Sequence, residues 1–175
     1  IDEGLVGSEM CIRDRQRGLN EALKLETELS SLSPEEVFKK IGMKIMTTVG
    51  GSSGALFATL LMGMAKKYSK ELNNLENLAA MFYEGVEATK KRGKADLGEK
   101  TMLDVLIPVS LSLNKLKNEK NIKIVAEKIK MVAKEGMLST RDIMATKGRA
   151  SFLGERAIGH IDPGARSSQL AISAI

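Results

Sequence analysis

The sequence predicts an all-α protein, an antiparallel helical bundle or barrel. Apolar residues recur every three or four positions along several segments, and no run alternates apolar and polar residues for the length of a convincing strand. Only 3% of the residues are aromatic, whereas β-sandwiches and β-barrels use more aromatic and β-branched residues. The 175 residues fit one domain, and 43% of them are hydrophobic, which is enough to bury a core.

Five amphipathic helices are predicted in order along the chain. The second begins at Ser33-Pro34-Glu35-Glu36, a capping box with proline at the first helical position. Short polar breaks separate the helices, so neighbours are expected to be antiparallel. Their apolar residues are Leu19, Ala22, Leu23 and Leu29; Val37, Ile41 and Ile45; Leu75, Leu78, Ala79, Phe82, Val86 and Thr89; Leu103, Leu106, Val109, Leu113 and Leu116; and Ile122, Val125, Ile129, Val132 and Ala133.

Residues 49–65 are apolar nearly all round rather than along one face. A membrane span is one interpretation, but the run is short and contains four glycines, two serines and a threonine. We therefore expect a central helix that is buried on every side.

The composition excludes several function classes. One cysteine and one histidine cannot build a closed zinc site or a disulfide framework. The net charge of +5 comes largely from lysines, which alternate with glutamates on helix faces as on a solvated surface. No aromatic residues lie between these lysines that could stack on nucleic-acid bases. We therefore expect no nucleic-acid partner and no membrane, and a cytoplasmic protein whose excess charge suits a phosphate ligand or an acidic partner.

Residues 1–15 differ from the rest of the chain. Their sequence, IDEGLVGSEMCIRDR, has no helical period, and its part LVGSEMCIRDR resembles the in-frame translation of a sequencing-library adapter. We expect residues 1–15 to be non-native and residues 16–175 to form a single domain that is incomplete at its N-terminus. The alternative is an ordinary flexible terminus. Cys11 lies in this segment and therefore indicates nothing about redox chemistry.

Three glycine-rich loops are candidates for binding a phosphate. Gly50-Gly51-Ser52-Ser53-Gly54 opens the apolar helix, where small residues let a phosphate approach the backbone and the helix N-terminus favours its negative charge. The other two loops span residues 92–102 and 147–165, and Asp162-Pro163 is typical of a helix N-cap and first turn. A plain cap and solvated loops are the alternatives. The scattered carboxylates Asp96, Glu99, Asp104 and Glu155 are expected to pair or cap rather than to hold a metal.

The loops carry a resemblance to a known family. The stretches VGGSSGALF, RGKADLGEKTMLDV and KGRASFLGERAIGHIDPGA resemble, in order, motifs of the nucleotide-binding L subunit of dihydroxyacetone kinases. The resemblance implies a helical barrel that holds ADP or ATP and Mg²⁺ in loops at one end. In the version of the bacterial phosphotransferase system, it implies that a phosphocarrier subunit rephosphorylates bound ADP. The phosphoryl group then passes to dihydroxyacetone held on a separate K subunit.

The resemblance also implies roles for individual residues, in four groups. Ser52 and Ser53 match residues that contact the phosphates; Gly93 and Met102 match the adenine end; Arg149 matches a nucleotide-contacting arginine; and Asp162, Pro163 and Gly164 match the final nucleotide loop. For Arg149, a salt bridge to Glu155 or Asp162 is the alternative.

One part of the family pattern is not matched. The family has an upstream loop with three aspartates that holds Mg²⁺, and residues 16–19 resemble the sequence that follows this loop. We therefore assign no metal ligand and no catalytic residue, and expect this chain to lack kinase activity. Two alternatives remain: a related domain of an ATP-dependent dihydroxyacetone or fatty-acid kinase, and a non-catalytic protein that binds a transcriptional regulator.

Overall fold

The computed structural model describes residues 16–18 and 20–174. These residues fall into two compact units, one up to Gly93 and the other from Lys94 onward. Every regular element among them is helical, which confirms the predicted all-α class. The adapter-like segment predicted at residues 1–15 and the predicted helical residue Leu19 lie outside the described residues.

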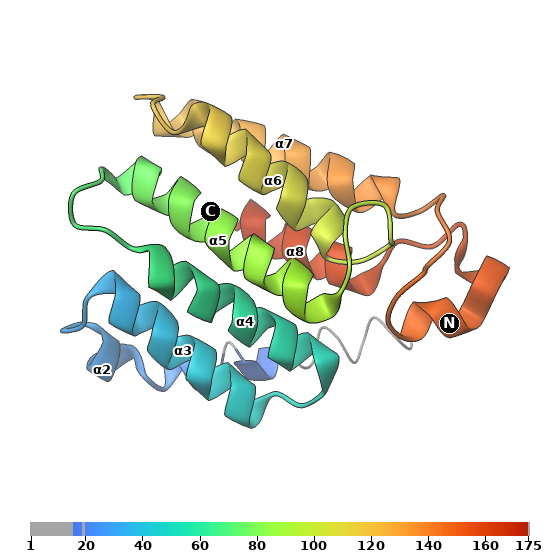
Figure 1. The fold of residues 1–175 in the computed structure, drawn as a ribbon, viewed down its shortest axis with the longest axis horizontal. Helices are drawn as coiled ribbons and strands as arrows, with labels where there is room; N and C mark the ends of the chain where they lie inside the picture. The colour runs from blue at the N-terminus through green and yellow to red at the C-terminus, as the bar shows by residue number, and fades with distance from the viewer. Residues whose placement is uncertain (1–15, 19, 175) are drawn as a thin grey trace. The chain divides into compact units, whose positions relative to one another are not determined.

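The first unit contains four labelled helices: α2 (Glu26–Leu29), α3 (Pro34–Thr48), α4 (Gly51–Lys67) and α5 (Asn74–Gly93). Helix α4 packs against α3 and against α5, and consecutive helices run in opposite directions (Figure 1). The predicted capping box is confirmed, because Ser33 and Glu36 each accept a hydrogen bond from the other's backbone N–H.

The single helix predicted through residues 19–29 is wrong. A turn at Lys24 and Leu25 interrupts it, and α2 spans only four residues. Leu25 stands at the N-cap of α2 with φ −94° and ψ 1°, and its apolar side chain cannot accept a hydrogen bond from the first turn. Apolar spacing alone did not reveal this break.

Glycines bring α4 and α5 into close contact. A Cβ on Gly85 would lie 2.6 Å from the Leu60 carbonyl oxygen, and one on Gly63 would lie 2.8 Å from the Gly85 Cα. Between Gly54 and Ala65, every residue of α4 is buried or half-buried, which agrees with the predicted buried helix. No helix of the described residues is long and apolar enough to cross a membrane.

The predicted apolar stripe of α5 is correct in part. Leu75, Ala79, Val86 and Thr89 are buried, but Leu78 is 39% exposed. Met81 and Gly85 are buried as well, so the buried face is wider than the stripe and centred elsewhere on the helix.

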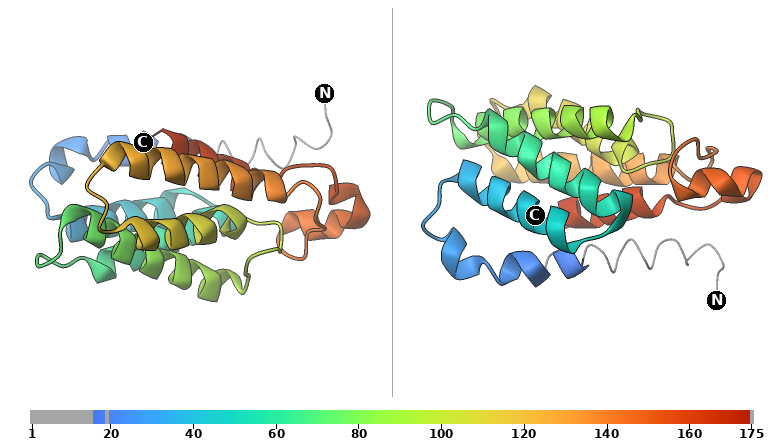
Figure 2. Two further views of the ribbon diagram at one scale, coloured as in Figure 1. Left: turned by 90° about the horizontal axis from the view of Figure 1, so that it is seen from above. Right: turned by 60° about the horizontal axis from the view of Figure 1, so that its bottom comes forward.

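The second unit contains α6 (Leu103–Leu116), α7 (Ile122–Ser139), the 3-10 helix η2 (Arg149–Ala157) and α8 (Pro163–Ser173). Helix α6 packs against α7, and α8 contacts both. A Cβ on Gly136 of α7 would lie 2.2 Å from the Asp104 carbonyl oxygen of α6, so these two helices also meet backbone to backbone. The segment η2 projects beyond the ends of α7 and α8 (Figure 2).

Candidate functional site

The first predicted glycine-rich loop forms the N-terminus of α4. Gly50 is extended, and Gly51 has a φ of +77°, a backbone conformation that favours glycine. No side chain caps this helix end, and a Cβ on either glycine would meet no atom within 4 Å beyond its chain neighbours. Ser52 is exposed and Ser53 is half-buried. A ligand therefore has access to the backbone where amide groups and the helix dipole attract negative charge.

Gly54 has a different role in the same loop. A Cβ there would lie 2.2 Å from the Val49 carbonyl oxygen, so only glycine fits without moving the backbone. The loop thus combines the two roles that its sequence left open, because Gly54 serves packing while Gly50 and Gly51 leave the helix end open.

The loop that precedes α6 is fixed by the buried carboxylate of Asp104. This side chain is 1% exposed and accepts hydrogen bonds from the N–H of Gly98 at 2.6 Å and of Thr101 at 2.7 Å. The expectation that Asp104 serves as a capping group is confirmed. Glu99 is another of the carboxylates expected to pair or cap. Its oxygen lies 3.6 Å from the ammonium nitrogen of Lys147, as expected for an ion-pairing residue.

The same loop carries a buried lysine. Lys100 is 3% exposed, and its ammonium donates hydrogen bonds to the carbonyl oxygens of Thr140, of His160 at 2.6 Å and of Arg141 at 3.5 Å. Burial lowers the pKa of Lys100, and nearby carboxylates oppose this effect. One side chain therefore joins the loop before α6 to the end of α7 and to the residues that precede α8.

Asp162 caps α8, as predicted. Its carboxylate accepts a hydrogen bond from the Ala165 N–H at 2.7 Å, and Pro163 occupies the first turn. Its own N–H donates to the hydroxyl of Thr140 at 3.0 Å. Burial raises the pKa of Asp162 to about 6, and the charge of Asp104 adds to the rise. Hydrogen bonds from backbone N–H groups and the positive charge of Lys100 act in the opposite direction.

Two of the residues matched to the nucleotide site meet at this helix end. A Cβ on Gly164 would lie 3.3 Å from the Met102 backbone nitrogen and 2.7 Å from an oxygen of the Asp162 carboxylate. Met102 is itself 6% exposed. Gly164 therefore allows the first turn of α8 to approach the start of α6.

The predicted site residues are divided between the two units. Ser52, Ser53 and Gly93 belong to the first unit, where Gly93 ends α5; Met102, Arg149, Asp162, Pro163 and Gly164 belong to the second. Within the second unit, the N-terminus of α8 brings together Met102 and the Asp162-Pro163-Gly164 turn. Arg149 is exposed at the start of η2, after Gly148, which has a φ of +66°.

Sequence reasoning missed the buried pair Lys100 and Thr140. Lys100 stands in a run of charged residues, a composition typical of a solvated loop, and its partners lie 40 to 60 positions further along the chain. Thr140 follows the predicted helix without any motif. No local pattern could have found either residue.

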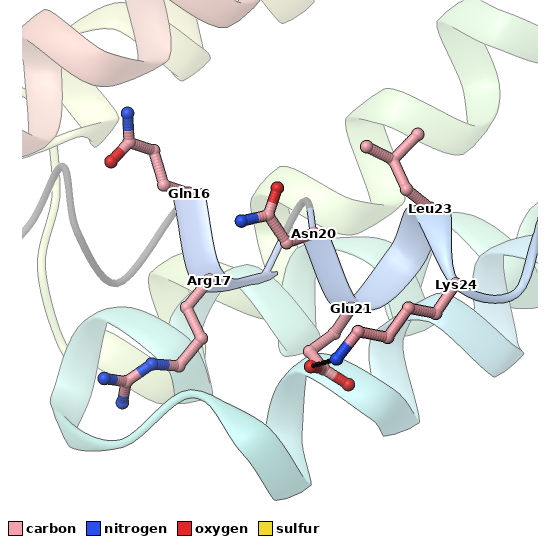
Figure 3. Close-up of a pocket in the computed structure, with 6 residues that line it drawn as sticks. All are labelled: Gln16, Arg17, Asn20, Glu21, Leu23 and Lys24. Atoms are coloured by element: carbon pink, nitrogen blue, oxygen red, sulfur yellow. Dashed lines mark hydrogen bonds and ion pairs between the residues drawn. The ribbon is translucent and has the colours of Figure 1, made fainter.

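Two surface hollows carry no ligand-binding arrangement. One, of about 800 Å³, is lined by Gln16, Arg17, Asn20, Glu21, Leu23 and Lys24 (Figure 3). Its carboxylate is paired, since Glu21 contacts both Lys24 and Lys44, and these contacts lower the pKa of Glu21.

The other hollow, of about 440 Å³, lies on α6 and α7 beside the loop that precedes α6. It is lined by Leu97, Gly98, Asp104, Pro108, Val132, Glu135, Gly136, Ser139 and Ile143. These residues include two acidic side chains and no basic one, so the hollow does not suit a phosphate.

The described part of the chain contains no group of three or more His, Cys, Asp or Glu side chains that could hold a metal ion. Carboxylate oxygens are the ligands that Mg²⁺ prefers in proteins, and Asp104 and Asp162 are already engaged by backbone N–H groups. The residues from Gln16 to Gly18 and from Asn20 to Ala174 therefore do not fit a magnesium site of their own.

Comparisons with known proteins converge on one family. The DAK2 domain profile matches residues 12–175. The ADP-binding subunit DhaL of PEP-dependent dihydroxyacetone kinase 1 from Listeria innocua is 43% identical over 159 residues, 91% of this chain and 75% of that protein. The ADP-binding subunit DhaL of the PTS-dependent dihydroxyacetone kinase of Lactococcus lactis is 43% identical over 168 residues, 96% of this chain and 78% of that protein.

A solved structure supports the fold. The crystal structure of the dihydroxyacetone kinase of C. freundii in its native form superposes with a TM-score of 0.64 at 23% identity, over 98% of this chain and 31% of that chain. At this identity the likeness concerns the all-helical fold.

Proposed function

This chain belongs to the DAK2 domain family, and from that premise we propose that it is the ADP-binding subunit of a dihydroxyacetone kinase. Subunits of this kind would relay a phosphoryl group, through bound nucleotide, to dihydroxyacetone held on a partner K subunit. For this chain, which is expected to lack kinase activity, we propose the nucleotide-binding part of that role. The observation that carries it is the N-terminus of α4, which has no side-chain cap and open space at Gly50 and Gly51. That geometry suits a nucleotide phosphate.

The two units make different contributions in this proposal. In the first, the backbone from Gly51 to Gly54 and the hydroxyls of Ser52 and Ser53 bind phosphate oxygens. For the second unit, taken by itself, the resemblance supports Arg149 as a phosphate contact, whose guanidinium would offset phosphate charge through paired N–H donors. These groups position the phosphates and offset their charge without forming a covalent bond to them.

The N-terminus of α8 suits another part of the nucleotide. The Asp162 carboxylate already accepts the Ala165 N–H, so the first turn of α8 has less to offer a phosphate than α4 has. A carboxylate at this point also repels phosphate. We therefore assign Met102 and the Asp162-Pro163-Gly164 turn to the adenosine end. Gly93, in the first unit, keeps the adenine role that the resemblance implies.

In phosphoryl transfer, Mg²⁺ would supply positive charge that offsets the charge of the phosphates. The described residues do not fit a magnesium site of their own, so none of them is assigned as a ligand of the ion.

The proposed partners are the K subunit and a phosphocarrier subunit of the phosphotransferase system. The names of the relatives support partnership with other kinase subunits in general, since they describe ADP-binding subunits of PEP-dependent and PTS-dependent kinases. A transcriptional regulator is a further proposed partner, and the proposed location is cytoplasmic.

Calorimetric titration with ADP and with adenosine tests the proposal. We expect ADP to bind and adenosine to bind at least about tenfold more weakly, because adenosine lacks the phosphates that the α4 N-terminus and Arg149 would hold. Failure to bind ADP, or equal affinity for the two compounds, would contradict the proposal.

A further inference from the structure

Lys100 is an unusual residue in the second unit. It is 3% exposed and has a φ of +59°, in the left-handed region that side chains other than glycine rarely adopt. A buried ammonium and a left-handed backbone are each unfavourable, and such conformations persist where the surrounding structure holds them in place. Both features therefore require compensation from the neighbours of Lys100.

The hydrogen bonds of Lys100 supply that compensation. An ammonium has three donors, and three carbonyl oxygens surround this one, those of Thr140, Arg141 and His160. The carboxylates of Asp162, Asp142 and Asp104 add favourable charge. Since all three donors are engaged by the protein, Lys100 has none left for a ligand.

The partners of Lys100 lead directly to the N-terminus of α8. The Thr140 carbonyl accepts from Lys100, while the Thr140 hydroxyl accepts from the Asp162 N–H. The His160 carbonyl, two residues before Asp162, also accepts from Lys100. On the other side, Lys100 is two residues before Met102, which meets Gly164.

We propose that Lys100 is a positioning residue for nucleotide binding, which holds Met102 and the Asp162-Pro163-Gly164 turn in register through the carbonyls of Thr140 and His160. The inference rests on the proposed function, because it assigns a purpose to this geometry at the adenosine end. Lys100 acts through these residues and does not touch the nucleotide.

The chain offers a matched control in Lys94. Lys94 is in the same loop and also has a positive φ, +47°, but its side chain is exposed. We expect Lys100→Met to weaken ADP binding about tenfold, because the adenosine end loses its alignment once the charged hydrogen bonds of Lys100 are gone, and Lys94→Met to leave it within about twofold. Unchanged ADP affinity in a folded Lys100→Met protein would overturn the proposal. If this variant does not fold, Lys100→Gln takes its place with the same expectation.

Amide hydrogen exchange separates local positioning from general stability. In the Lys100 variant, the amides of Ala165 and Arg166 should exchange about tenfold faster, while those of Val109 and Ile129 in α6 and α7 keep their rates. An equal increase at all four amides would show that Lys100 only stabilises the unit and would overturn the proposal. This readout needs no nucleotide, so it still decides the role of Lys100 if the proposed function fails.

Chemical rescue tests the ammonium itself. In a Cys11→Ser background, Lys100→Cys is alkylated in denaturant to carry either an aminoethyl group, which restores a lysine-like ammonium, or a propyl group of equal length without charge. We expect only the aminoethyl protein to regain the ADP affinity of the Cys11→Ser protein after refolding. Equal affinities for the two refolded proteins would overturn the proposal.

Discussion

The N-termini of α4 and α8 are built in opposite ways. At α4, two glycines leave the backbone accessible and no side chain caps the helix. At α8, the buried carboxylate of Asp162 accepts a hydrogen bond from the Ala165 N–H in the first turn. Lys100 holds the residues before this turn through the carbonyl of His160. The first arrangement leaves the helix end open, whereas in the second the Asp162 carboxylate already accepts a hydrogen bond from the first turn. A helix N-terminus in a matched motif is therefore no proof of phosphate contact.

The largest expected effect concerns the buried carboxylate that fixes the loop before α6. Asp104→Ala leaves the N–H groups of Gly98 and Thr101 without their acceptor. Loss of two charge-assisted hydrogen bonds should lower the free energy of unfolding by about 3 to 5 kcal/mol. Urea unfolding followed by circular dichroism measures this free energy, with Glu127→Ala on the exposed face of α7 as the control. A loss no greater than that of the control would contradict the assignment of Asp104 as a structural cap.

The next effect is a pH dependence at the α8 end. Burial raises the pKa of Asp162 from 3.8 to about 6 in the folded protein, so the folded state binds a proton more tightly than the unfolded state. The contribution of Asp162 to stability therefore falls as pH rises from about 4 to 6, by about 2 to 3 kcal/mol. Asp162→Asn keeps a cap acceptor but does not titrate.

The comparison of the two proteins isolates this contribution from other titrating groups. Urea unfolding at several pH values should show the stability of the wild type falling relative to that of Asp162→Asn across this range. Parallel stability profiles would mean that Asp162 is less buried than the structure has it.

Arg149 provides a test on the ligand side. If its guanidinium binds the phosphates, Arg149→Ala should weaken ADP binding by about 1.5 to 3 kcal/mol, the range for charged hydrogen bonds. Arg156→Ala, an exposed arginine of the same segment η2, should leave ADP affinity nearly unchanged. Calorimetry that finds equal losses in the two variants would remove Arg149 from the site.

The smallest effect distinguishes the two glycines at α4. Gly51 has a positive φ and Gly50 does not, so Gly51→Ala should cost about 1 kcal/mol of stability while Gly50→Ala costs little. Thermal unfolding without nucleotide measures the difference. Gly51→Val adds bulk at the open helix end and should also reduce the ADP-induced rise in melting temperature. An undiminished rise would mean that the loop serves packing only.

The sequence predicted most of the helical framework because apolar spacing and caps are local signals. The capping box at Ser33, the cap at Asp162 and the buried stripe of α6 all follow from residues a few positions apart. The break at Leu25 was missed because apolar spacing continues across it. Lys100 was missed because its burial depends on carbonyls contributed from residues 140 and 160, and backbone acceptors leave no trace in the sequence.

The candidate site also has a part that local sequence could predict and a part that it could not. The α4 loop was predicted from its own glycines, and its access is a local property. The meeting of Met102 with Gly164 joins residues 62 positions apart, and spacing along the chain could not predict it. The roles of Ser52, Ser53, Gly93 and Arg149 toward a nucleotide stay predictions from the resemblance.

Amide chemical-shift changes on titration with ADP test the central claim most directly, because they report on both helix ends in one experiment. The account predicts the largest changes at residues 51–54, at Arg149, and at Gly164 and Ala165, with saturation at one common ADP concentration. Changes confined to the hollow around residues 16–24, or their absence from residues 51–54, would contradict it.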